Sequence, residues 1–343
     1  MENDDLMARK KMTALHKKYL IFSALVLIMT ALTYNCGDND DLIETQFDFK
    51  VERTLSSDES DSPYFFARIL DVCANSKYIY VSDWKRYCIK VFDHNFNFIK
   101  QIGTKGDGPK EFGQIFVNMT CNEKHLCIIT VNRLYTLSAN GDFIKETILK
   151  FMPGQLFLLP EGFLFKRNSP GDVFAITDYG GNIIETFFKA QIIATKQCGK
   201  ISAVPNAFLT SNKELFIMDS MRYKIDSLDL STKKVGTLMI RDVDFLGMKC
   251  TRNKNGEWDF EGGYSWMVEG GKYFYYFYYN SEKQLKMDIY SKSGKNNLKL
   301  KSTGKCASRF LPLCIIPGSN RFVGVIPDES HMLYICKLIE TSM

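Results

Sequence analysis

Residues 78–112 constrain the fold of this chain more than any other stretch. Three short runs rich in aromatic and β-branched residues lie over 78–83, 87–92 and 96–102, and polar turns separate them. Such runs are typical of β-strands, and the short turns between them join strands that run antiparallel. A Gly-rich segment, 103–112, follows. The stretch therefore predicts a small antiparallel sheet that ends in a tight connection.

The same pattern returns later in the chain. Residues 215–229 align with 79–93 without a gap, which places Asp219 on Asp83 and Arg222 on Arg86. The offset, 219 minus 83, is 136 residues, or three repeats of about 45 residues each. Because a small repeated sheet buries its faces only against neighbouring copies, several copies are expected.

The segment resembles the NHL repeat of β-propellers. In that repeat the strands are followed by a Gly-x-Gly-Pro-x-x-Phe connection to the next blade, and Gly106, Gly108, Pro109 and Phe112 match it here. Over residues 45–343 the chain resembles the six-bladed, NHL-like propeller lipoproteins of Gram-negative bacteria. The resemblance implies a β-propeller fold.

Strand counting gives the number of blades. Five complete blades are expected, over residues 64–102, 115–150, 155–190, 203–240 and 264–300. A sixth, from Phe310, has only three strand-like runs, and the isolated alternating run 45–55 can supply the fourth. The sequence thus predicts an all-β, six-bladed propeller closed by its N-terminal strand, which leaves no unpaired edge.

The start of the chain has the features of a targeting signal. Basic residues through Lys18 precede the apolar run 19–32, which is short for a membrane span and right for a signal peptide. The following segment resembles a bacterial lipobox, although Leu32 is one place early and Asn35 is bulkier than usual. The resemblance implies cleavage before Cys36 and a lipid on its sulfur; an uncleaved anchor and soluble secretion are the alternatives. We expect a signal peptide (1–35), an acidic tether (36–44) and the propeller (45–343).

These features predict the location and the class of partner. A lipid anchor on Cys36 would hold the protein in the outer membrane of the cell envelope, facing the periplasm or the cell surface. The acidic residues 38–41 resemble a surface-export signal, and a solvated tether explains them equally well. The net charge of +5 is too mild to indicate nucleic acid. The expected partners are the membrane and a glycan, a peptide or an envelope protein.

The direction of each strand determines on which of the two faces of the ring each connection lies. Links between blades and turns between second and third strands share one face, here called the link face. It is predicted to carry Trp84–Arg86, the linker 103–113, the turn 220–222 and the insertion 241–263. Long loops on a rigid scaffold often carry recognition, and exposed aromatic side chains suit stacking on sugars or protein. The candidate ligand-binding residues are Trp84, Arg86, Arg222, Trp258 and Phe260. Alternatively, the Trp side chains fill gaps between blades and the Arg side chains form ion pairs between blades.

The residues give little support for catalysis. His94 and His125 are predicted on the face opposite His331, so the three cannot share a zinc ion. The alternative function is a calcium-dependent hydrolase or lyase in the central channel, a class to which related propellers belong. Its metal ligands would be Asn118 and Asn206, joined by Asp71 or Glu269. Calcium is the one cofactor considered; local backbone hydrogen bonds explain these amides, and the repeated Asp83 and Asp219, more simply.

The remaining patterns concern the core. The aromatic run 273–279 is predicted to be a buried strand rather than a cofactor site. Nine cysteines follow Cys36, an odd number without a Cys-x-x-Cys pair, so neither a disulfide framework nor a zinc knuckle is expected. One or two bridges are compatible with an oxidising compartment. The nine are Cys73, Cys88, Cys121, Cys127, Cys198, Cys250, Cys306, Cys314 and Cys336.

Overall fold

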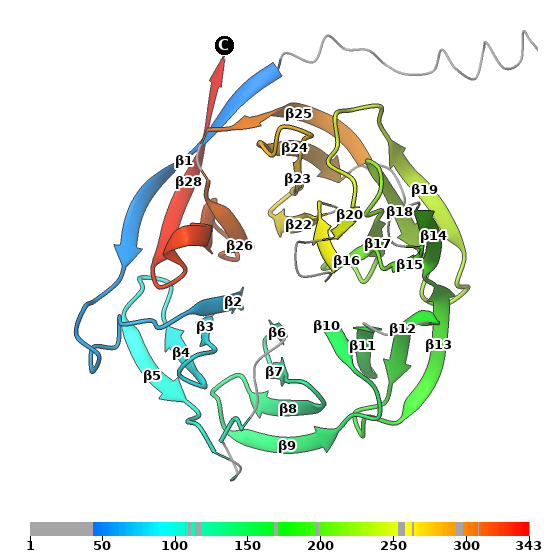
Figure 1. Ribbon diagram of the computed structural model, residues 1–343. Helices are drawn as coiled ribbons and strands as arrows, with labels where there is room; N and C mark the ends of the chain where they lie inside the picture. The colour runs from blue at the N-terminus through cyan, green and yellow to red at the C-terminus, as the bar shows by residue number, and fades with distance from the viewer. Residues whose placement is uncertain are drawn as a thin grey trace, which may run out of the picture. The chain divides into compact units, whose positions relative to one another are not determined.

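The computed structural model is a ring of β-sheets arranged around a central axis (Figure 1). It describes residues 44–106, 108, 111–113, 118–167, 171–195, 199–252, 258–262, 264–292, 298–307 and 309–342. The predicted signal peptide, Cys36 and all but the last residue of the predicted tether lie outside these ranges. Within the described ranges no helix is long and apolar enough to cross a membrane.

Blades one to four are separate four-stranded sheets whose strands follow chain order from the axis outward. Blade one comprises β2 (Ile69–Ala74), β3 (Ile79–Asp83), β4 (Cys88–Phe92) and β5 (Phe98–Ile102). Blade two comprises β6 (Asn118–Cys121), β7 (His125–Ile129), β8 (Arg133–Ser138) and β9 (Phe143–Ile148). Blade three comprises β10 (Pro153–Leu159), β11 (Gly162–Arg167), β12 (Asp172–Thr177) and β13 (Ile183–Lys189). Blade four comprises β16 (Asn206–Leu209), β17 (Leu215–Met218), β18 (Lys224–Leu228) and β19 (Val235–Ile240).

Blades five and six complete the ring as predicted. Blade five comprises β22 (Ser265–Gly270), β23 (Tyr273–Tyr279), β24 (Leu285–Lys292) and β25 (Leu298–Cys306). Blade six comprises β26 (Leu311–Ile315), β27 (Arg321–Val325) and β28 (Leu333–Ser342), with a 3-10 turn, η1 (Pro327–Glu329), before β28. Its outer strand is β1 (Glu44–Leu55), which runs antiparallel to β28 with Phe49 opposite Leu338. The prediction of a six-bladed propeller closed by its N-terminal strand is confirmed.

The closing strand also makes a contact that the sequence did not predict. The first residues of β1 pair in parallel with β25, Glu44 lying opposite Thr303 and Phe47 opposite Cys306. Blades five and six therefore form one continuous eight-stranded sheet. Figure 1 shows the start of β1 and the end of β28 together at the rim of the ring.

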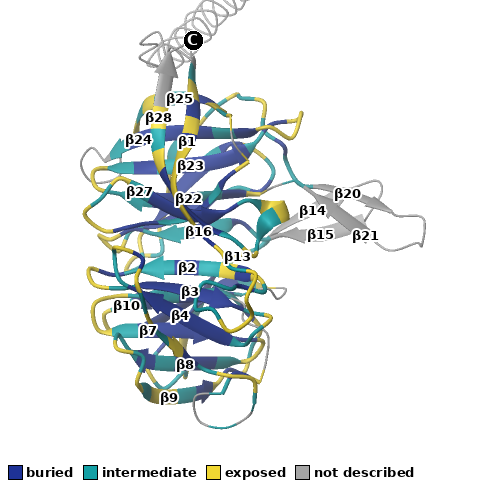
Figure 2. Cartoon of the chain, turned by 90° about the vertical axis from the view of Figure 1, so that its left-hand side faces the viewer, coloured by how far each residue is buried: buried dark blue, intermediate teal, exposed yellow. Residues whose placement is uncertain are grey.

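The core lies between neighbouring blades. The middle strands are buried on both faces, as in β3 and β4, whereas the outer strands alternate, as in β5. Figure 2 shows β3 and β4 in dark blue, the colour of buried residues. The predicted aromatic strand is β23, whose Phe274, Tyr276, Phe277 and Tyr278 are buried, so its assignment to the core is confirmed.

The Gly-rich connection fills the joint between blades one and two. Gly103 has a φ of 82°, and a Cβ there would lie 2.1 Å from the ring of Phe112. Phe112 is fully buried, and its ring centroid lies 5.1 Å from that of Tyr135 in blade two. Only glycine has both the backbone freedom and the room that this contact needs.

Among the described residues, two hairpins interrupt the links between blades. The hairpin β14 (Gln191–Thr195)–β15 (Gly199–Ala203) joins blade three to blade four, and β20 (Lys249–Arg252)–β21 (Trp258–Glu261) joins blade four to blade five. The second lies in the predicted insertion 241–263, and the first was not predicted. Since both belong to inter-blade links, the strand directions assign both to the link face.

Candidate binding sites on the link face, in the channel and in an opposite groove

The turn after β3 holds two of the predicted ligand-binding residues. Trp84 is half-buried and packs against the cluster between blades one and two, while the Arg68 guanidinium lies 5.5 Å from its ring centroid. Arg86 donates a hydrogen bond to the Ser60 carbonyl at 2.7 Å and lies 5.3 Å from the ring centroid of Phe65. These contacts fasten the connection 56–68 to blade one. Each side chain still keeps part of its surface on the link face.

Asp83 is structural, as its repeat position predicts, but it acts on a different backbone segment. Its buried carboxylate accepts hydrogen bonds from the amides of Ala67, at 2.8 Å, and Arg68, at 2.9 Å. It therefore caps the chain entering β2 rather than its own turn.

The equivalent turn in blade four is built differently. Asp219 accepts a hydrogen bond from the Met221 amide at 2.7 Å and an ion-pair contact from Arg222 Nε at 3.4 Å. This ion pair lies within one turn and does not join two blades. The Arg222 side chain stays 62% exposed, so its guanidinium is accessible on the link face.

The other two predicted residues, Trp258 and Phe260, belong to β21, where they pair with Arg252 and Cys250. Their side chains lie outside the described part of the structure. The start of this insertion is fixed by Arg241, which forms an ion pair with the fully buried Asp288 of blade five. Because a hydrogen-bonded buried ion pair is costly to break, the insertion leaves the ring from a rigid point.

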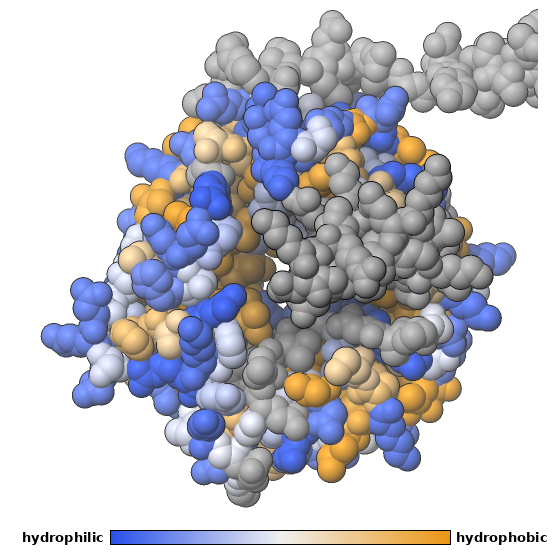
Figure 3. All heavy atoms as spheres, in the orientation of Figure 1, coloured by the Kyte–Doolittle hydropathy of each residue, from blue (hydrophilic) through white to orange (hydrophobic). Residues whose placement is uncertain are grey.

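A cavity of about 770 Å³ runs along the ring axis. Its wall comes from the first strand of every blade: β2, β6, β10, β16, β22 and β26. Figure 3 shows the link face with a hollow at its centre, where the visible wall is mainly hydrophobic. The volume falls in the range of pockets that enclose small ligands.

Hydrogen bonds cross between blades at the link-face end of this channel. Asp71 Oδ2 accepts from Asn118 Nδ2 and from the Met119 amide, both at 2.8 Å. Asn118 Oδ1 in turn accepts from the Leu156 amide at 2.9 Å. Burial raises the pKa of Asp71 to about 6, against the opposing effect of these hydrogen bonds. The hydrogen bonds from Asn118 to Asp71 and from Leu156 to Asn118 thus connect blades one, two and three.

The remaining proposed calcium ligands are engaged elsewhere. Asn206 Oδ1 lies 3.4 Å from Lys166 Nζ, a buried ammonium whose pKa burial lowers to about 8. Glu269 accepts hydrogen bonds from the amide and hydroxyl of Ser211, at 2.7 and 2.6 Å, in the turn at the far end of the channel. With the Asn118 oxygen occupied and a cation beside Asn206, these residues do not fit a calcium ion. Among the described residues no three His, Cys, Asp or Glu side chains form a metal-binding group.

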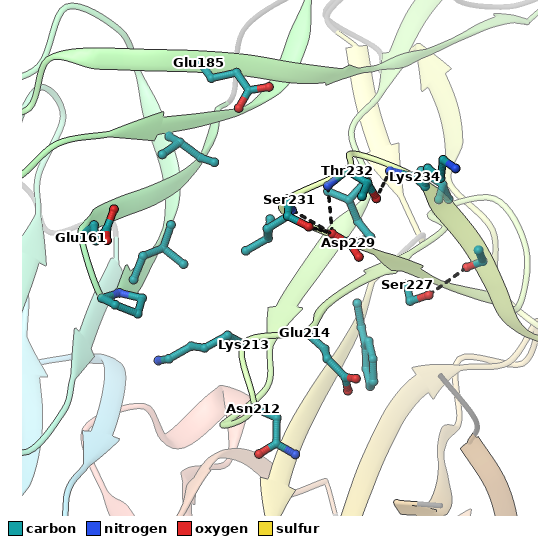
Figure 4. A pocket seen from close by; sticks show the side chains of 18 of the residues that line it. Glu161, Glu185, Asn212, Lys213, Glu214, Ser227, Asp229, Ser231, Thr232 and Lys234 are labelled. Atoms are coloured by element: carbon teal, nitrogen blue, oxygen red, sulfur yellow. Dashed lines mark hydrogen bonds between the residues drawn. The ribbon is translucent and has the colours of Figure 1, made fainter. Parts of the chain in front are cut away.

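A larger groove, of about 1470 Å³, lies on the opposite face around the turns of blades three and four. Figure 4 shows Lys213 and Glu214 in the turn before β17, and Asp229 in the turn after β18. The Asp229 carboxylate caps its own turn by accepting hydrogen bonds from the Ser231 hydroxyl and from the amides of Thr232 and Ser231, and these bonds lower its pKa to about 2. The sequence does not predict this groove, because the turns and strand ends that line it share no recurring pattern.

Comparisons with known proteins support the fold. The family model DUF5128, described as a 6-bladed beta-propeller, matches residues 59–204. A solved member of the DUF4221 family from Bacteroides vulgatus has a TM-score of 0.57 at 11% identity, covering 87% of this chain and 99% of its own. A candidate exported protein of Bacteroides fragilis has a TM-score of 0.55 at 13% identity, covering 90% of this chain and 98% of its own. No curated protein sequence matches the chain.

Proposed function

We propose that this protein is a non-enzymatic binding protein of the cell envelope. It is anchored through a lipid on Cys36 and binds a glycan, a peptide or a partner protein at its link face, over the mouth of the central channel. The likeness to a candidate exported protein supports a place outside the cytoplasm, and the sequence from Lys18 to Cys36 supports the anchor.

One observation carries the choice of face. In the part of the chain that the structure describes, the hairpins β14–β15 and β20–β21 are additions to the four-stranded blades, and both belong to inter-blade links. Added segments on one face of a rigid ring are a common way to build a recognition surface. Trp84, Arg86 and Arg222 supply aromatic and cationic groups on the same face.

The test compares the two faces of the ring. Trp84→Ala and Trp258→Ala are expected to weaken capture on a glycan or peptide array by tenfold or more, since an aromatic anchor commonly contributes about 2 kcal/mol. Tyr179→Ala is the matched control, because Tyr179 is an exposed aromatic side chain, 44% accessible, beside a turn of the opposite face. Thermal melting of each variant excludes unfolding as the cause.

The opposite result would show that the ligand binds elsewhere than on the link face. If Tyr179→Ala abolishes capture while both Trp variants retain it, ligands bind on the opposite face and the proposed face is wrong.

A further inference from the structure

Three thiols line one side of the central channel. They are Cys73 on β2, Cys121 on β6 and Cys314 on β26, the first strands of blades one, two and six. Blade one lies between the other two in the ring. The binding face proposed above makes no use of these thiols.

Two hydrogen bonds join the segments that carry Cys73 and Cys121, one before the two cysteines in the chain and one after them. On one side Asp71 Oδ2 accepts from the Met119 amide at 2.8 Å, and on the other Asn75 Nδ2 donates to the Asn122 carbonyl at 3.1 Å. Cys73 lies two residues after Asp71, and Cys121 lies two residues after Met119. Because side chains alternate along a strand, Cys73 points to the same side of β2 as Asp71, and Cys121 points to the same side of β6 as Met119.

The packing also brings these two thiols together. Cys73 and Cys121 both pack against the cluster between blades one and two, whereas Cys314 packs against the cluster between blades six and one. Burial raises the pKa of Cys73, and the neighbouring Cys121 thiol raises it further. We propose that Cys73 and Cys121 form a disulfide bond that joins blades one and two at the channel wall.

The oxidation needs an external disulfide, either that of a thiol oxidoreductase or a low-molecular-weight one. One cysteine thiolate attacks it and forms a mixed disulfide, which releases one thiol. The second cysteine then displaces the other thiol, so the protein loses two protons and two electrons and the oxidant becomes two thiols. Burial raises the pKa of Cys73 well above its usual value, and the thiolate is the nucleophile. The bond should therefore form quickly during folding and slowly once the reduced chain has folded.

Differential alkylation of the full-length chain tests the pairing. The protein is folded in reduced and oxidised glutathione, denatured in acid, labelled with one alkylating reagent, then reduced and labelled with a second. We expect the second label on Cys73 and Cys121 and the first on Cys88, Cys127 and Cys314. A first label on either Cys73 or Cys121, or a recovered Cys73–Cys314 peptide, would overturn the proposal. This outcome depends on neither the anchor nor the ligand.

Melting with and without reductant provides a second readout. Reduction should lower the melting temperature of the wild type and of Cys314→Ser by roughly 5 °C or more, because the unfolded chain regains the freedom of a closed loop. Cys121→Ser should be insensitive to reductant. An unchanged wild-type melting temperature on reduction contradicts the proposal, and the wild type and Cys314→Ser decide the question even if Cys121→Ser does not fold.

Discussion

At the scale of single residues, the two repeated aspartates show how one sequence position can hold two structural roles. Asp83 is fully buried and caps two amides of a distant segment, whereas Asp219 caps its own turn and contacts an exposed arginine. The cost of removing a carboxylate depends on the buried donors left without a partner. The two positions should therefore differ in their contribution to stability.

We expect Asp83→Ala to lower the free energy of unfolding by about 2–4 kcal/mol, because the amides of Ala67 and Arg68 both lose their acceptor. Asp219→Ala is the matched control and should cost about 1 kcal/mol, since one turn amide can bind water instead. Urea unfolding of both variants measures the difference. Equal costs would show that Asp83 does not hold the entry to β2.

The channel carboxyl group should make stability depend on pH. The folded-state pKa of Asp71, about 6, lies above its ordinary value of 3.8. The contribution of this carboxyl group to the free energy of unfolding is therefore complete below pH 3.8 and is lost as the pH rises through 6. The free energy of unfolding of the wild type, relative to that of Asp71→Asn, should fall by about 2 kcal/mol over this range. This is less than the full pKa shift implies, because the Asp71 side chain is partly exposed. Urea unfolding at pH 4 and pH 7 checks it; a difference that does not vary with pH contradicts the burial effect.

Lys166 should show the reverse dependence. Burial lowers its pKa from 10.5 to about 8, so the charged form destabilises the fold below pH 8 and the cost disappears as pH rises towards 10.5. Lys166→Met should therefore raise the free energy of unfolding by about 2–3 kcal/mol at pH 7 and by much less at pH 10. Urea unfolding of both proteins at the two pH values gives the comparison, and a Met variant less stable at pH 7 would show that the ammonium is fully compensated.

At the scale of elements, β1 closes the ring through its side chains as well as its backbone. Phe49 is buried, and its ring centroid lies 4.9 Å from that of Phe310 and 5.2 Å from that of Phe322. Val51, two residues later on the same strand, is 47% exposed. Phe49 and Val51 therefore differ in burial, although both pair with β28 through their backbone.

Phe49→Ala should lower the free energy of unfolding by about 3–5 kcal/mol, since a buried ring is lost and a cavity remains. Val51→Ala is the control and should change it by less than about 0.5 kcal/mol. Chemical denaturation followed by tryptophan fluorescence measures both. Similar small effects for the two variants would mean that β1 contributes little to closure.

The sequence predicted the blades because each strand has its own local signal. It also predicted the partner of β1, since only blade six lacked an outer strand. It did not predict the parallel pairing of β1 with β25 or the hairpin β14–β15, because no nearby turn or repeat determines them. The contacts of Asn118 and Asn206 also escaped prediction: they cross from blade to blade, and their distances depend on how neighbouring sheets pack.

At the scale of the whole molecule, the predicted anchor determines where the ring can act. Cys36→Ala should abolish incorporation of labelled palmitate and move the protein from the membrane fraction to the soluble fraction. Asn35→Ala is the control, because it leaves the cysteine in place and makes the preceding residue small. Labelling that survives Cys36→Ala would refute the anchor, whatever ligand the propeller binds.

The double pairing of β1 has a mechanical consequence. Residues 36–43 lead directly into a strand that is hydrogen-bonded to β28 on one side and to β25 on the other. A pull transmitted along the chain from a fixed N-terminus would load both ladders in shear, so that many hydrogen bonds share the force instead of opening one at a time. The point of attachment would then be among the last parts of the ring to yield under tension.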